Sequence, residues 1–530
     1  MEEEAVGLGH GDEILWKSNI PPLLLLLIPI LFSTIFILRS HLKKKNKPTF
    51  PLPPGPWKLP IIGNIHQLAA FSAGVPIHRR FADLAEQYGP IMHLKLGETS
   101  NVIISSPESA REFLRTHDQN FAARPYLPSA DIIFYGSKDI AFCSEGDYWR
   151  QMRKILTMEL LTDKRVKSFR PILEAEASKL MNLIGSEPAG GVVNLSRLLV
   201  SVGNAMTSRT AFGKIRGLEG SFLPVIHRIL QALGGFSVGD IFPSNRLLRL
   251  ISGTERHLKK LHQEADVILQ GIIDEHVSRR RNRETEHLDK AVATGGEEEE
   301  DLVDVLLACT DNHLEVKAVI LVRIYDIFLA GGDTSPVTVE WAMSELMKNP
   351  EKMNKVQREV REMFDKRGKV VDDACFNELH YLKSVVKETF RLHPPVPLSI
   401  PREGRETVVI NGCQIPAKTR IIVNSWAIGR NSSHWTQPDQ FIPERFLNSS
   451  IDYKGNDFQL IPFGAGRRMC PGMNYGIFVV YLLLANLLYH FDWKLPNQIK
   501  PQDLDMSEDS GGTVPRKNNL YLNSIPYHAP

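Results

Sequence analysis

One cysteine near the C-terminus lies in a loop whose composition favours chemistry. The stretch PFGAGRRMCPG, residues 462–472, places Cys470 after two glycines and two arginines and directly before Pro-Gly. A long apolar run with helical spacing follows, so a buried helix is expected there. Pro471 suits the first position of that helix, which would make Cys470 its N-cap. The positive end of a helix lowers the pKa of a thiol, and the resulting thiolate is a nucleophile or a metal ligand.

The residues around Cys470 restrict that chemistry. Gly464 and Gly466 allow a tight turn and the close approach of a flat ligand, and Arg467 and Arg468 offer planar donors for carboxylates. A zinc site is disfavoured because no second Cys or His lies nearby at the usual spacing. A cysteine hydrolase would need a paired histidine that the sequence does not single out. A buried structural cysteine is the plain alternative, but the eleven residues together favour a heme bound through sulfur.

The pattern F-x-x-G-x-R-x-C, formed by Phe463, Gly466, Arg468 and Cys470, resembles the heme loop of the cytochrome P-450 superfamily. The resemblance covers nearly the whole chain. It implies the cytochrome P-450 fold, mainly α with a small β-rich lobe, preceded by one N-terminal transmembrane helix. It also implies heme b as cofactor, with Cys470 as the axial ligand of the iron and with Phe463, Gly464 and Arg468 in contact with the heme.

Composition excludes several other classes of protein. The chain has 530 residues and a formal net charge of +2, from 63 basic and 61 acidic residues, which gives no case for nucleic-acid binding. Its five cysteines are scattered and odd in number, so a disulfide framework is not expected and a reducing compartment is favoured.

An uncharged apolar stretch near the N-terminus, residues 21–38, is about long enough to cross a bilayer. A cleaved signal peptide is the alternative, but acidic residues precede the stretch and no small-residue cleavage site follows it. The basic cluster HLKKKNK, residues 41–47, is expected to stay on the cytosolic side. A single uncleaved anchor is therefore predicted.

These features predict four regions. Residues 1–20 would form a lumenal segment, 21–40 the transmembrane anchor, 41–60 a basic and proline-rich linker, and 61–530 the heme-thiolate catalytic domain. Within that domain most of the sequence has helical periodicity, and two β-rich stretches lie at 93–107 and 405–428.

The segment 315–350 has the pattern of one long helix, yet it contains Gly331, Gly332 and Pro336. These residues would cost roughly 5 kcal/mol relative to alanines. The helix could instead end at Gly331, and a second helix could begin with Ser335 as N-cap and Pro336 in its first turn. Both interpretations remain open on the sequence.

Within that segment, A-G-G-D-T, residues 330–334, resembles the superfamily's central-helix kink over the oxygen-binding face. The resemblance implies that the glycines leave room for dioxygen, that Asp333 organises a proton relay and that Thr334 holds the hydroperoxide. Proton delivery of this kind is general acid catalysis. The acid and hydroxyl favour a monooxygenase, because family members that merely rearrange peroxides often lack this threonine.

Further residues match supporting positions of the family. Glu388 and Arg391 are three apart on a predicted helix and resemble its E-x-x-R pair, which Arg445 in PERF would complete as structural support. Heme propionates need cations, and three positions besides Arg468 match the family's donors. They are Trp149, Arg153 and Arg402.

The resemblance implies insertion of one oxygen atom from dioxygen into a C–H bond or across a C=C bond. NADPH would supply electrons through a flavoprotein reductase docked near Cys470. The motifs look most like plant members of the endoplasmic reticulum membrane, single-pass and facing the cytosol, that act in specialised metabolism. Largely apolar pocket segments favour a lipophilic substrate, a terpenoid before an alkaloid or a phenolic. A heme-thiolate isomerase or dehydratase, and a non-catalytic heme-binding protein, remain alternatives.

Overall fold

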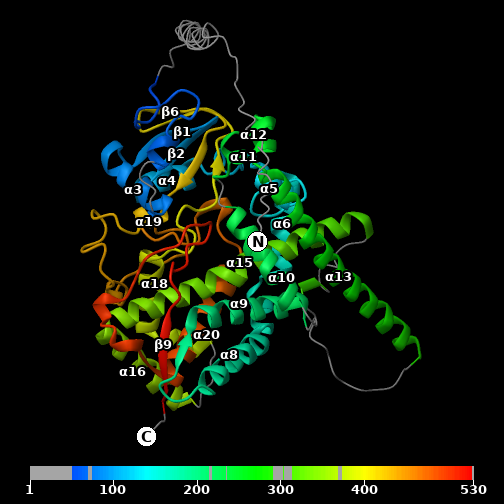
Figure 1. Ribbon diagram of the computed structural model, residues 1–530, viewed down its shortest axis with the longest axis vertical. Helices are drawn as coiled ribbons and strands as arrows, with labels where there is room; N and C mark the ends of the chain where they lie inside the picture. Colours follow the sequence, from blue (N-terminus) through cyan, green and yellow to red (C-terminus); the bar gives the residue numbers. More distant parts are fainter. Residues whose placement is uncertain are drawn as a thin grey trace, which may run out of the picture. The chain divides into compact units, whose positions relative to one another are not determined.

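Helices dominate the part of the chain that the computed structural model describes, and the strands form small sheets (Figure 1). The described residues are 50–69, 74–213, 218–233, 236–289, 302–303, 313–367 and 373–527. Residues 52–530 form one structural unit, and residues 1–51 are assigned to another. The predicted mainly α fold with a small β-rich lobe is confirmed, whereas the predicted anchor lies outside the described residues.

The helices are distributed along the described chain from residue 65 to residue 490. They are α2 (Ile65–Ala69), α3 (Ile77–Tyr88), α4 (Pro107–Arg111), α5 (Pro128–Ile133), α6 (Asp147–Ile155), α7 (Asp163–Ser168), α8 (Arg170–Gly185), α9 (Leu195–Phe212), α10 (Leu218–Ala232), α11 (Val238–Ile241), α12 (Arg246–Ile251), α13 (Thr254–Asp289), α15 (His313–Lys348), α16 (Pro350–Arg367), α17 (Asp373–Glu378), α18 (His380–Leu392), α19 (Ser425–Ile428) and α20 (Met473–His490). Short π and 3-10 turns include η1 (Glu112–Thr116), η2 (Leu156–Leu160), η3 (Pro443–Phe446) and η4 (Gly466–Arg468).

Three small sheets join distant parts of the sequence. The largest has the order β1 (Ile91–Leu96), β2 (Thr99–Ile104), β7 (Arg420–Val423) and β4 (Arg402–Glu403). The second has the order β3 (Val192–Asn194), β9 (Tyr521–Pro526) and β8 (Phe491–Lys494), and the third pairs β5 (Val408–Ile410) with β6 (Cys413–Ile415). Both predicted β-rich stretches therefore contain strands. The β1–β2 hairpin lies in Figure 1 at the end of the unit opposite to α8, α16 and α20.

The core is centred on α20, which packs against α15, α16 and α8. Nearly every apolar side chain of α20 is buried, which agrees with the buried helix predicted after Cys470. Among the described residues, α20 is also the one helix whose length and composition would suit a membrane span, but 72% of it is buried inside the protein. It is therefore a core helix of the catalytic unit.

The helix α15 is continuous, with Pro336 inside it, so the one-helix interpretation is confirmed. Glycines of α15 and α9 lie directly against larger residues of the other helix. A Cβ at Gly203 would lie 2.2 Å from Cγ of Pro336, and a Cβ at Gly332 would lie 2.6 Å from Oδ1 of Asn204. Gly332 therefore faces α9, and close packing of the two helices offsets the poor helix propensity of α15.

Replacing Gly203 with alanine tests this packing. The added methyl group cannot fit against Pro336, so the free energy of unfolding should fall by about 1–3 kcal/mol, as at other overpacked sites. Chemical denaturation measures the change. The control is Gly271→Ala in α13, where a Cβ meets no atom within 4 Å and stability should rise by up to about 1 kcal/mol. Equal stability of both variants would show that α9 can move away from α15 at little cost.

Candidate active site

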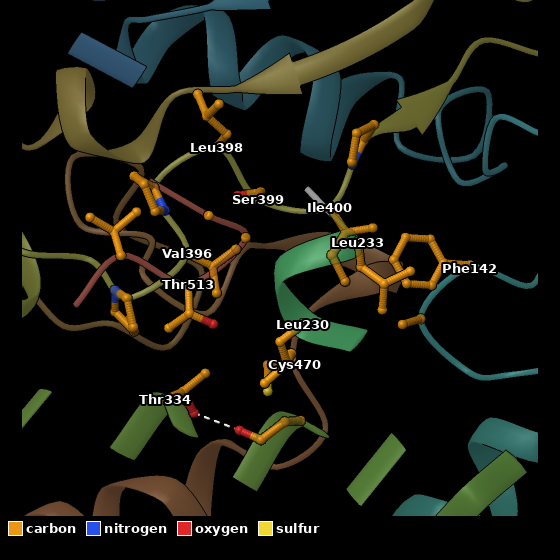
Figure 2. Close-up of a pocket in the computed structure, with 18 of the residues that line it drawn as sticks. Phe142, Leu230, Leu233, Thr334, Val396, Leu398, Ser399, Ile400, Cys470 and Thr513 are labelled. Carbon is orange, nitrogen blue, oxygen red and sulfur yellow. Dashed lines mark hydrogen bonds between the residues drawn. The ribbon is translucent and has the colours of Figure 1, made fainter. Parts of the chain in front are cut away.

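A cavity of about 1390 Å³ lies between α15, the loop 462–472 and the segments 395–402 and 510–514. Its volume exceeds the usual range for a small-molecule pocket, about 300–1,000 Å³, so it can hold a cofactor and a substrate together. Figure 2 shows Cys470 and Thr334 among the residues that line it. Most of the other labelled residues are apolar, namely Phe142, Leu230, Leu233, Val396, Leu398 and Ile400.

The loop that carries Cys470 is closed on itself. The amide of Cys470 donates to the carbonyl of Phe463 at 2.9 Å, and the amide of Met469 donates to the carbonyl of Gly466 at 3.0 Å. Gly464 and Gly466 have φ angles of 69° and 67°, which other residues rarely adopt. The predicted tight turn is confirmed, and it presents the sulfur to the cavity.

The expected helix cap at Cys470 is wrong. The helix α20 begins at Met473, and its N-cap is Gly472, so Pro471 and Gly472 form an extra turn between the cysteine and the helix. Burial raises the pKa of the Cys470 thiol, and the backbone of Gly472 and the charge of Arg153 only partly oppose this effect. A bound metal ion, which deprotonates a coordinating thiol, would therefore be the main cause of thiolate formation here.

Arg153, Arg402 and Arg468 all line the cavity. Each also ties the Cys470 loop to the rest of the protein by hydrogen bonds to backbone carbonyl groups. Arg153 donates to Met469 at 2.6 Å, Arg402 to Ala465 at 2.6 Å, and Arg468 to Ala122 and Cys143 at 2.8 and 2.7 Å. These side chains thus shape the loop as well as the cavity wall.

Trp149 is not among the residues that line the cavity. Its ring centroid lies 4.1 Å from the guanidinium carbon of Arg468, and its indole N–H donates to the carbonyl of Ile140 at 3.1 Å. The structure therefore places Trp149 behind Arg468, where stacking fixes the orientation of the arginine.

Arg124 also lines the cavity, and the sequence analysis missed it. It donates to the carbonyls of Ala141, Ile400 and Pro401 at 2.7, 2.6 and 2.8 Å. Nothing in its own stretch, NFAARPY, has a spacing that signals a ligand. The available signal was an arginine within an otherwise apolar run before proline.

The four arginines concentrate positive charge at one side of the cavity. Burial, together with the charges of Arg402 and Arg153, lowers the pKa of Arg468 to about 10. Burial and the charges of Arg468, Arg402 and Arg153 likewise lower the pKa of Arg124. The nearby Asp139 gives incomplete compensation, because burial raises its pKa to about 7. Such a cluster fits an anionic ligand, and the two propionates of heme have the required charge.

The other predicted site residues differ in whether they line the cavity. Thr334 lies on the cavity wall, where its hydroxyl donates to the carbonyl of Ala330 at 2.6 Å (Figure 2). Asp333 is not among the residues that line the cavity, whereas Gly331, Phe463 and Gly464 are. Gly331 also lies against Thr207 of α9.

The predicted support at Glu388 and Arg391 is confirmed. Both side chains are fully buried and form two hydrogen bonds, at 2.7 and 2.8 Å. Arg445 reaches Glu388 at 3.2 Å, as the PERF motif predicted. Because Arg391 also donates to the carbonyls of Gly429, Pro438 and Gln440, the pair joins α18 to the chain before and within η3.

Replacing Arg124 with lysine tests the arginine that the sequence analysis missed. One ammonium group cannot reach three carbonyls in a fork geometry, so unfolding should become easier by about 1.5–3 kcal/mol for each charged hydrogen bond lost. Heme content per chain should fall in parallel. Both are measured by denaturation and by absorbance, with Arg197→Lys at an exposed position of α9 as control. Wild-type heme content in Arg124→Lys would contradict a role in binding.

Comparison with known proteins agrees with this geometry. The family model described as Cytochrome P450 matches residues 53–522. Cytochrome P450 71D10 of Glycine max is 48% identical over 93% of this chain and 95% of its own length. The 5-epiaristolochene 1,3-dihydroxylase of Nicotiana tabacum is 46% identical over 94% and 97%. A zebra fish cytochrome P450 solved with abiraterone has the same fold, with a TM-score of 0.69 and 24% identity over 86% of this chain and 100% of its own. The chain therefore belongs to the cytochrome P450 family.

Proposed function

We propose that this monooxygenase hydroxylates or epoxidises a small lipophilic plant metabolite of the terpenoid class. It would use dioxygen and electrons that NADPH delivers through a flavoprotein reductase. The observation that carries the proposal is one cavity in which Cys470 and Thr334 share a mostly apolar wall. The similarity to an enzyme named as a dihydroxylase of 5-epiaristolochene supports the substrate class. An alkaloid or a phenolic is the alternative substrate.

The residues of the chain would divide the work between binding and chemistry. Cys470 would bind the heme iron through sulfur, and the cluster of arginines would bind the propionates. Bound heme would supply the activation of dioxygen. The Thr334 hydroxyl, which bonds Ala330, would rotate to pass a proton into the cavity, and Asp333, at the preceding position of α15, would organise the proton relay. Phe463 and Gly464, which belong to the loop and line the cavity, would contact the heme.

The apolar wall of the cavity would exclude water and orient the substrate by contact. Leu230 and Leu233 come from α10 and the residues after it, Phe142 from the chain before α6, and Val396 and Ile400 from the chain after α18. These side chains offer contact area and few hydrogen-bond partners, which suits a compact hydrocarbon skeleton. Regiochemistry would follow from which C–H bond this wall directs toward the iron.

The surface beside the Cys470 loop carries exposed basic side chains that could bind an acidic reductase. They lie on α6, on α7 and in the loop itself: Arg150, Lys154, Lys164, Lys167 and Arg467. Two hydrogen bonds join these elements to the loop and to α20, since Arg153 donates to Met469 and Asn474 to Asp163. Complementary charge would speed the encounter with the reductase.

Exposed apolar side chains on α12 support contact with a membrane. Leu247, Leu250 and Ile251 are 64%, 68% and 72% exposed, which would be unfavourable in water and favourable at a lipid surface. Together with an anchor at 21–40, this face would hold the catalytic unit on the cytosolic side of the endoplasmic reticulum membrane.

Replacing Cys470 with alanine tests the heme-thiolate site. Carbon monoxide bound to the reduced wild-type protein in microsomes should give a strongly red-shifted Soret band, because the thiolate donates electron density to the iron. The variant should lose that band. Cys143→Ala, which changes a cysteine that does not line the cavity, should keep it. A wild-type band typical of imidazole ligation, or no heme in folded protein, would overturn the proposal.

The same preparation separates the alternative reactions. Terpenoid hydrocarbons incubated with NADPH and reductase should give products that carry one added oxygen atom. Turnover without NADPH would favour an isomerase or dehydratase, and an unchanged spectrum with every lipophilic candidate would favour a non-catalytic protein.

Replacing Thr334 with valine tests proton delivery. Product formation should fall by about 10²-fold, the scale of general acid catalysis, while NADPH oxidation continues and hydrogen peroxide accumulates. The ratio of product to NADPH consumed measures this loss of coupling. The matched control is Thr389→Val in α18, because that buried hydroxyl also bonds a carbonyl four residues back but lies off the cavity. Unchanged coupling in Thr334→Val would remove the hydroxyl from the mechanism.

A further inference from the structure

One carboxylate and one guanidinium hold the segment that precedes Cys470 from outside the loop. Arg402 donates to the carbonyl of Ala465 at 2.6 Å, and the amide of Arg467 donates to Oδ2 of Asp118 at 2.8 Å. Arg402 also donates to Oδ1 of Asp118 at 2.8 Å. The three hydrogen bonds close a ring around Gly466.

The loop lies directly against Asp118 and the end of η1. A Cβ at Gly466 would be 2.6 Å from Oδ1 of Asp118 and 2.4 Å from the carbonyl of Leu114. No side chain fits into this contact, so the loop backbone can take its position only with glycine at 466. The close contact between the loop and Asp118 therefore depends on glycine at 466 and on the short aspartate side chain at 118.

Both groups that hold the loop are themselves fixed. Arg402 begins β4, whose backbone pairs with β7 in the four-stranded sheet. Asp118 follows η1, where the amides of Asn120 and Phe121 donate to the carbonyl of His117. The side chains of Arg402 and Asp118 are 6% and 14% exposed, and charge-assisted hydrogen bonds are strong when they are shielded from water. The ring therefore transmits the positions of the sheet and of η1 to the loop.

We propose that Asp118 is a positioning residue that fixes the sulfur of Cys470 and, through the same ion pair, the guanidinium of Arg402. The connection to the sulfur is short. Asp118 holds the amide of Arg467, and the carbonyl of Gly466 in turn accepts from Met469, the neighbour of Cys470. Groups behind a metal ligand commonly orient it in this way. The inference rests on the proposed heme-thiolate site.

The experiment compares Asp118→Asn and Asp118→Ala with wild type. Asparagine keeps the volume and one acceptor oxygen but loses the charge, so it should fold normally, which circular dichroism checks. In the carbon monoxide complex, loss of the thiolate ligand converts the red-shifted Soret band to a band at shorter wavelength. This conversion should become about tenfold faster in Asp118→Asn and faster still in Asp118→Ala. The control is Glu112→Gln, which changes a carboxylate of η1 that pairs with His117 and should convert at the wild-type rate.

A double-mutant cycle with Arg402→Gln adds a second test. Because Asp118 and Arg402 act in one ring, Asp118→Asn should have a much smaller effect in the Arg402→Gln background than in wild type. Additive effects, or a wild-type conversion rate in folded Asp118→Asn and Asp118→Ala, would overturn the role of Asp118. The proposed heme-thiolate function would still stand. Absence of the thiolate-type band from wild type would instead overturn the proposed function and this inference with it.

Discussion

The site depends on arginine side chains that donate to backbone carbonyls of the cysteine loop and its neighbours. Loops carry few hydrogen bonds of their own, so their position usually varies more than that of helices. Here Arg153 and Arg402 donate to the loop carbonyls of Met469 and Ala465. Arg468, which belongs to the loop, donates outward to the carbonyl of Cys143, and burial keeps these charged bonds strong. The same guanidinium groups face the cavity. One set of residues thus positions the sulfur and supplies the charge that an anionic cofactor needs, so the two properties cannot vary independently.

The cavity wall formed by α15 depends on the unusually close packing of α15 against α9. Gly203 of α9 meets Pro336 of α15, and Gly332 of α15 meets Asn204 of α9. These contacts keep a helix intact that its own sequence disfavours, and they fix where Thr334 stands on the cavity wall. Because Gly332 packs against α9, the open space of the cavity beside α15 is bounded mainly by apolar segments and by Gly331, which lines the cavity and also lies against Thr207 of α9.

Local patterns predicted those parts of the structure that depend on neighbours in sequence. The cysteine loop, the Glu388–Arg391 pair and the buried helix α20 each show their residue types at fixed spacing. Arg124 and Asp118 could not be found this way, because each depends on a distant part of the chain: Arg124 bonds to Ile400, 276 residues away, and Asp118 to Arg402, 284 residues away. The cap at Cys470 was mispredicted because Pro-Gly starts an extra turn as readily as a helix. Trp149 matched a donor position of the family by its residue type and place in the sequence, yet only packing reveals that it lies behind Arg468.

The long separation between partners also sets an order of events during synthesis. Arg468 bonds to the carbonyl of Ala122, which lies 346 residues earlier in the chain. At about 5–20 residues per second, roughly 17–70 s pass on the ribosome between the two. Throughout that time Arg124 and Arg153 exist without the loop that they enclose. A nascent chain therefore lacks Cys470 until nearly nine-tenths of it has been made, and the cavity residues 510–514 follow later still. Capture of a heme that binds through this sulfur is thus a late step of biogenesis.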